Sequence, residues 1–124
     1  MLSELEHLAQ EDFCYLTTTG RISGRPHTIE IWFALHHSTL YILAGDRDKS
    51  DWVKNILKYP PVSIKLGTLL YSGLGRIISP TTEDDALARQ LVADKYIPRS
   101  SDDLSDWSRT SLPVAIDLQP SSSQ

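Results

Sequence analysis

Hydrophobic and polar residues alternate along several short stretches of the chain, a pattern typical of β-strands with one buried face. In the clearest stretch, residues 27–35, apolar side chains occupy the odd positions from Ile29 to Leu35. Thr28, Glu30 and Trp32 point to the other face. Further strands are predicted over residues 13–19, 39–44, 62–66, 69–78 and 112–118. The two glycines of the 69–78 stretch, Gly73 and Gly75, indicate a bulge or a sharp bend.

Three other stretches have helical character. Residues 50–58 carry apolar side chains at helical spacing and end before the pair Pro60-Pro61. A second helix is predicted from residues 80–84 onward, where a threonine cap precedes acidic residues of the first turn. Residues 2–11 are expected to form a short amphipathic helix, and residues 98–111 a polar loop.

The predicted order is therefore (α)-β-β-β-α-β-β-α-β, a mainly β fold with six strands. Short hairpin connections favour antiparallel pairing, and glycine-kinked short strands favour a small barrel over an open sheet. A doubly wound α/β fold needs more helices between the strands. We expect an N-terminal helix over 1–12, a single barrel domain over 13–119 and a disordered tail over 120–124.

Composition narrows the classes of protein. The net charge of −4 argues against a nucleic-acid binder, because phosphate neutralisation needs a basic face. The single cysteine, Cys14, excludes an intrachain disulfide. No apolar run approaches the ~20 residues of a membrane span, and the first ten residues do not resemble a signal peptide. We expect a soluble, cytoplasmic protein without a membrane partner.

The first candidate site is the turn 20–26 with the histidine that follows it, where two arginines, a serine, two glycines and His27 come together. Glycine-rich turns expose backbone N–H groups, and arginine adds bidentate contacts to anions. The turn is either a cradle for a phosphate or carboxylate, or a solvated hairpin connection.

The second candidate is the segment 44–50, which enters the helix at Trp52. Arg47, Lys49 and Ser50 at a helix N-terminus can hold a phosphate. The aspartates of the same segment would repel one, and Ser50 or Asp48 can instead cap the helix.

The even face of strand 27–35 is the third candidate. Trp32 would leave a large apolar group in water, so a cofactor ring or a second subunit should cover it. No metal site is predicted, because the pair His36-His37 lacks a third ligand nearby in the sequence.

Three segments resemble the deazaflavin-dependent nitroreductase and quinone reductase family. Residues 16–26, LTTTGRISGRP, resemble the family's L-T-T-T-G-R-x-[ST]-G-x-P strand and turn. Residues 52–60 resemble its W-x-x-N-L-x-x-x-P segment, and residues 107–114 its W-x-x-R-x-x-P-[IV] close. The family is similar to the flavin-binding split barrels of the pyridoxamine-phosphate oxidase type.

The resemblance implies a split β-barrel that uses coenzyme F420 as hydride donor to a small hydrophobic acceptor, a quinone or a nitroaromatic. It also implies a homodimer. The implied coenzyme contacts are Arg21, Ile22, Ser23, Arg25, His27, Thr28, Ile29, Glu30, Ala44, Gly45, Asp46, Trp52 and Asn55. Arg47, Lys49 and Ser50 are added as candidate coenzyme contacts, because this stretch can hold the phosphate and the acidic tail. Trp32, Tyr96 and Trp107 are the candidate acceptor contacts, and no catalytic acid or base is assigned.

The chain departs from the family pattern in several places. Ile22 stands where many members have a basic residue, and aspartates stand at 46 and 48, where many members have an S-K-G-G stretch. Residues 98–105 lack the tyrosines of some nitroreductases. Two alternatives therefore stay open. One is a split-barrel flavoprotein that binds FMN, which needs fewer cations, and the other is a non-catalytic module that binds haem or another planar cofactor.

Overall fold

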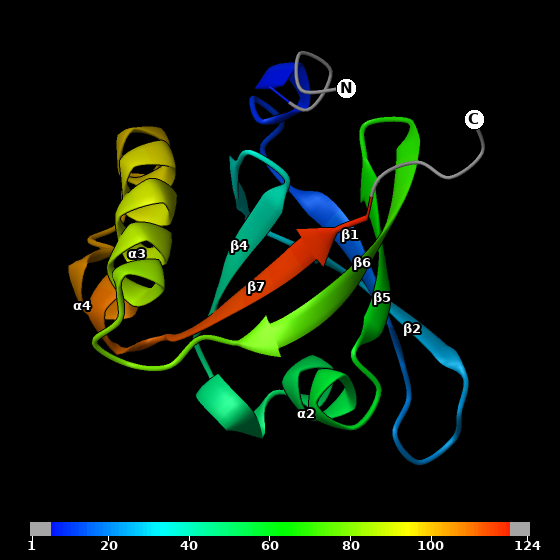
Figure 1. Ribbon diagram of the computed structural model, residues 1–124. Coiled ribbons are helices and arrows are strands. Elements are labelled where there is room, and N and C mark those ends of the chain that lie inside the picture. Colours follow the sequence, from blue (N-terminus) through cyan, green and yellow to red (C-terminus); the bar gives the residue numbers. More distant parts are fainter. Residues whose placement is uncertain (1–5, 120–124) are drawn as a thin grey trace.

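A computed structural model of the chain describes residues 6–119, and its centre is one curled antiparallel sheet (Figure 1). The strands are β1 (Cys14–Thr19), β2 (Pro26–Ile31), β3 (Ala34–His36), β4 (Thr39–Ala44), β5 (Pro61–Leu66), β6 (Leu69–Ile77) and β7 (Leu112–Leu118). They are ordered β2-β1-β5-β6-β7-β4-β3. The mainly β, antiparallel prediction is confirmed, but the sheet has seven strands and not six.

The additional strand arises because the stretch predicted as one strand, 27–35, is broken after Ile31. Phe33 and Ala34 are both buried although they are neighbours, so the alternation stops there. The Tyr96 hydroxyl supplies the hydrogen bonds that a neighbouring strand would give: it accepts from the Phe33 N–H at 3.0 Å. The break sends β2 and β3 to opposite edges of the sheet.

The helical elements are η1 (Arg47–Lys49), α2 (Asp51–Lys58), α3 (Glu83–Tyr96), η2 (Ile97–Arg99) and α4 (Ser105–Thr110). The predicted cap of α3 is confirmed, since the Thr82 hydroxyl accepts from the Asp85 N–H at 3.1 Å. The polar loop predicted over 98–111 is wrong, because η2 and α4 form there. Of the predicted N-terminal helix, residues 6–8 are helical, while residues 1–5 and the predicted tail 120–124 lie outside the described residues.

Two apolar clusters hold the helices on the two faces of the sheet. Inside the curl, Val53 and Ile56 of α2 pack with Leu16, Ile64 and Ile116 of the strands. On the outer face, α3 covers β4 and β7 through a second cluster (Figure 1). That cluster includes Tyr41, Leu43, Ala88, Val92, Tyr96 and Ala115. None of the helices over residues 6–119 is long and apolar enough to cross a membrane.

The glycines of β6 serve close packing, and the bulge expected from them is absent. Their strand keeps an unbroken register with β5 and with β7. A Cβ at Gly75 would lie 2.8 Å from Cγ2 of Ile56, and one at Gly73 would lie 2.6 Å from Cγ2 of Ile116. Both glycines therefore let core side chains reach the β6 backbone.

Lys95, at the end of α3, is bound to the strand break. Its Nζ donates to the Phe33 carbonyl at 3.0 Å and lies 3.6 Å from the centroid of the Phe33 ring. Burial, followed by repulsion from Arg99, lowers the pKa of Lys95 from 10.5 to about 8. Between these values the unfolded chain binds a proton at Lys95 that the folded chain lacks. Stability therefore rises with pH across this window.

We expect Lys95→Met to remove that rise. From pH 8 to 10.5 the free energy of unfolding of the wild type should increase relative to the variant by up to about 3 kcal/mol. Urea unfolding at a series of pH values measures it. The exposed Lys54→Met on α2 is the control and should keep the wild-type pH dependence. If the free energy of unfolding depended on pH in the same way for Lys95→Met and wild type, the lowered pKa would not belong to Lys95.

Candidate functional site

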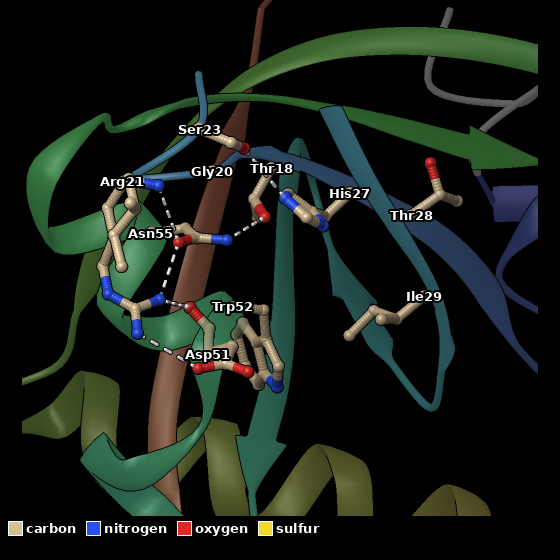
Figure 2. A pocket seen from close by; sticks show the side chains of 11 residues that line it. Thr18, Gly20, Arg21, Ser23, His27, Thr28, Ile29, Asp51, Trp52 and Asn55 are labelled. Carbon is tan, nitrogen blue, oxygen red and sulfur yellow. Dashed lines mark hydrogen bonds and ion pairs between the residues drawn. The ribbon is translucent and has the colours of Figure 1, made fainter. Parts of the chain in front are cut away.

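A pocket of about 520 Å³ lies between the turn 20–26, the start of β2 and helix α2 (Figure 2). We call it the turn pocket. It is lined by Thr18, Gly20, Arg21, Ile22, Ser23, His27, Thr28, Ile29, Asp51, Trp52 and Asn55. The sequence-predicted contacts among these are Arg21, Ile22, Ser23, His27, Thr28, Ile29, Trp52 and Asn55. The structure thus joins the first candidate segment, the start of β2 and α2 in one cavity, while Glu30 and Trp32 of the even strand face lie outside it.

Asn55 fastens the turn to α2 and to β1. Its side chain is 3 % exposed, and its Oδ1 accepts from both the backbone N–H and Nη1 of Arg21, each at 3.0 Å. Its Nδ2 donates to the Thr18 hydroxyl at 3.0 Å, so both ends of the amide are bound (Figure 2). A buried amide that is bound through both its oxygen and its nitrogen fixes the position of the groups around it.

The side chain of Arg21 lies along α2 and links the turn to the first residue of this helix. Its Nη2 lies 3.1 Å from the Asp51 carboxylate, and its Nη1 also donates to the Asp51 carbonyl at 3.3 Å. Asp51 is largely exposed, so this ion pair contributes little stability by itself. It does neutralise part of the Arg21 charge, so the guanidinium is not a free anion anchor.

The turn itself closes on backbone bonds. The Gly24 N–H donates to the Gly20 carbonyl, and the Gly20 N–H to the Arg25 carbonyl, both at 2.8 Å. Gly24 has φ 73°, which glycine adopts without strain. A Cβ at Gly20 would lie 2.6 Å from Nε2 of His27 and 2.7 Å from Oγ of Ser23, so it would fill the floor of the pocket.

The remaining predicted coenzyme contacts do not line the turn pocket. They are Arg25, Glu30, Ala44, Gly45, Asp46, Arg47, Lys49 and Ser50. Ala44 is in the core, and Arg47 uses Nη1 to bind the Thr110 carbonyl beside α4. Ser50 occupies the N-cap position of α2, but its side chain accepts no capping hydrogen bond. Gly45 lies against Trp107, whose Cδ1 would be 3.5 Å from a Cβ there.

The three predicted acceptor contacts come together in an aromatic cluster. The rings of Trp32 and Tyr96 are stacked, with centroids 4.3 Å apart and planes at 1°. Trp107 meets Trp32 edge to face at 5.6 Å and 89°. Trp32 is thus covered on one side by its own chain, a cover the sequence did not indicate, and remains 38 % exposed.

A second cavity, of about 550 Å³, opens beside this cluster. We call it the aromatic cavity. It is lined by Glu30, Ile31, Trp32, Leu43, Asp102, Asp103, Leu104 and Trp107. Strand β2 connects the two cavities, because Ile29 lines the turn pocket and the next residue, Glu30, lines the aromatic cavity.

Sequence reasoning missed several lining residues. Thr18, Gly20 and Asp51 flank predicted contacts, so their position next to the turn and in the first turn of α2 was the available signal. Asp102, Asp103 and Leu104 reach the aromatic cavity from the segment between η2 and α4. That segment has no periodic pattern, and only the tertiary fold brings it to β2.

Comparisons with known proteins identify the family and the fold. A sequence profile of the F420H(2)-dependent quinone reductase family matches residues 3–119. No curated protein matches the chain. Among solved structures, an F420-H2 dependent reductase (FDR-A) is similar at TM-score 0.69 and 20% identity, with 88% of this chain and 95% of that one covered.

Two further structures share the fold. HutZ, the heme storage protein from Vibrio cholerae, is similar at TM-score 0.75 and 13% identity, over 96% of this chain and 90% of that one. A protein described as a domain-swapped dimer is similar at TM-score 0.69 and 19% identity, over 94% of each chain. Since the family profile spans nearly the whole sequence, the chain belongs to the F420H(2)-dependent quinone reductase family and is an oxidoreductase that uses coenzyme F420.

Proposed function

We propose that the chain binds F420H2 in the turn pocket and reduces a planar acceptor, a quinone or a nitroaromatic, held in the aromatic cavity. The observation that carries this proposal is strand β2, whose consecutive residues Ile29 and Glu30 line the two cavities. Hydride transfer needs donor and acceptor atoms about 3–3.5 Å apart, so the coenzyme ring has to extend along β2 past Ile29 and meet the acceptor where the two cavities adjoin. Such positioning is the protein's main contribution when a cofactor supplies the chemistry.

The residues of the turn pocket fit an anionic coenzyme with a flat ring. The volume of about 520 Å³ is in the range of small-molecule sites. Gly20 leaves the floor open, since a side chain there would collide with His27 and Ser23. Among the hydrogen bonds of residues 6–119, none uses the N–H of Ile22 or of Ser23, so both are available to a phosphate or carboxylate.

The roles of the individual residues follow from these contacts. The N–H groups of Ile22 and Ser23 bind anionic groups of the coenzyme, and Arg25, whose carbonyl accepts from the Gly20 N–H, adds a positive charge to the turn. Asn55 and Arg21 hold the turn in shape, and Trp52 of α2 offers an apolar wall. The reduced deazaflavin supplies the hydride. Trp32 and Trp107 orient the acceptor through their ring faces and exclude water.

Titration of the purified protein with F420 and with FMN at one ionic strength tests the first half of the proposal. Micromolar or tighter binding of F420, with much weaker binding of FMN, supports it. The reverse preference would move the chain to the flavoproteins, the alternative that the acidic segment 44–50 favours. Binding of neither would return the turn pocket to a structural role.

Quinone reduction by F420H2 tests the second half. Trp107→Ala should raise the KM for a naphthoquinone about tenfold, because a buried aromatic contact of this kind contributes on the order of 1–3 kcal/mol. The dissociation constant of F420 should not change, since Trp107 does not line the turn pocket. An unchanged KM for every acceptor tried would remove the aromatic cavity from the proposal.

We also infer that the curled sheet is a split β-barrel and that the chain forms a homodimer. A solved structure described as a domain-swapped dimer shares the fold, and β2 and β3 here are edge strands with one side free for pairing. Sedimentation at micromolar concentration measures the assembly, and a monomer there would contradict the inference.

A further inference from the structure

The aromatic cavity has an unbalanced charge. Beside its two indole rings it carries the carboxylates of Glu30, Asp102 and Asp103, and within the described residues no lysine, arginine or histidine lines it. All three acidic residues are exposed at the rim, while Leu43 is buried at the base. The cavity is therefore apolar and aromatic in its walls and negative at its mouth.

Three cations on the neighbouring helical elements are held by groups outside this rim. Arg99 of η2 is paired with Asp12, and Arg109 of α4 with Asp106. Lys95 of α3 donates to the Phe33 carbonyl. Asp103 stays ionised, since hydrogen bonds from the hydroxyl and N–H of Ser105 lower its pKa.

We propose that the aromatic cavity selects acceptors by charge: it favours a planar acceptor that bears a cationic group and rejects an anionic one. Indole faces attract cations, and carboxylates beside them add a long-range attraction. For an anionic acceptor both effects change sign. The inference rests on the proposed function, because it names the class of acceptor that the aromatic cavity would take.

The test uses three naphthoquinones with the same ring and the same alkyl linker, ending in a trimethylammonium, a hydroxyl or a sulfonate group. Their dissociation constants are measured by quenching of tryptophan fluorescence without coenzyme, and their KM values by oxidation of F420H2. The cationic quinone should bind about fivefold more tightly than the neutral one, and the anionic quinone about fivefold more weakly, as partly screened rim charges allow. High salt should reduce the differences between the three dissociation constants, because it screens the rim charges.

The double variant Glu30→Gln/Asp102→Asn should bring the three dissociation constants together. Within residues 6–119 neither carboxylate makes an ion pair or a hydrogen bond, so removing its charge breaks no contact of the fold. The matched control Glu83→Gln/Asp94→Asn changes the net charge equally on exposed positions of α3 that do not line the cavity. It should keep the wild-type order.

The outcomes separate the inference from the proposed function. Reduction of all three quinones with equal KM, or a preference for the sulfonate, would overturn the charge selection and leave the proposed function standing. Binding in the expected order without reduction would uphold the charge selection and overturn the acceptor role. If none of the quinones binds, both are overturned.

Discussion

Asn55→Ala is expected to weaken F420 binding at least about tenfold and to lower the free energy of unfolding by about 2–4 kcal/mol. The side chain is buried, and it is the group through which α2 holds both Arg21 and Thr18. Removing it leaves the Thr18 hydroxyl and the Arg21 N–H without their partner at the floor of the pocket. The turn 20–26 then loses its fixed position, so the coenzyme must order the turn as it binds.

Urea unfolding measures the stability and fluorescence titration the affinity. Asn55→Asp is a matched second variant, since its carboxylate can still accept from Arg21 and can accept from the Thr18 hydroxyl. It should bind F420 more tightly than Asn55→Ala. Lys54→Ala, one residue earlier on the exposed side of α2, should leave the affinity unchanged. Wild-type affinity of Asn55→Ala would show that the turn forms without this bond, and would contradict the role given to Asn55.

The features of the fold that the sequence predicted are those fixed by local pattern. Apolar spacing and the proline pair marked α2, and the threonine with the acidic residues after it marked the start of α3. The alternation of apolar and polar residues located the strands, except that it continues through Trp32 and Phe33, where the structure has a break between β2 and β3. There the break depends on the hydroxyl of Tyr96, which is 63 residues away in the sequence, so no local pattern could reveal it.

In the candidate site, too, local sequence features were predictable and tertiary contacts were not. A basic, glycine-rich turn was visible in the sequence, but the partners of Arg21 are Asp51 and Asn55, 30 and 34 residues later. Spacing alone gave Arg21 the role of an anion anchor, whereas the fold uses it as a brace. Resemblance to the family supplied Asn55. The acidic rim of the aromatic cavity had no signal, because Glu30 and Asp102 meet only through the tertiary fold.

Tyr96→Phe is expected to lower the free energy of unfolding by about 2–3 kcal/mol, the range for leaving a buried polar group without a partner. The hydroxyl accepts from the Phe33 N–H at 3.0 Å, and Phe33 is fully buried. Its single proton has the Asp12 carbonyl at 2.7 Å, while Lys95 donates to the Phe33 carbonyl. Burial raises the pKa of Tyr96 to about 12, so the proton is present at any working pH.

The variant keeps the ring that stacks on Trp32, so the decrease in the free energy of unfolding measures the contribution of the hydroxyl and not that of ring packing. Amide hydrogen exchange should become faster at Phe33, and the KM for the acceptor should rise because Trp32 lies one residue before the freed N–H.

Tyr41→Phe is the matched control. The hydroxyl of Tyr41 donates to Asp84 at 2.8 Å, and Asp84 keeps its ion pair with Arg76. That variant should lose about 1 kcal/mol or less, with no change in the KM for the acceptor. Equal losses for the two variants would mean that the hydroxyl of Tyr96 does not hold the strand break. The division into β2 and β3, and with it the position of Trp32 in the wall of the aromatic cavity, would then need another cause.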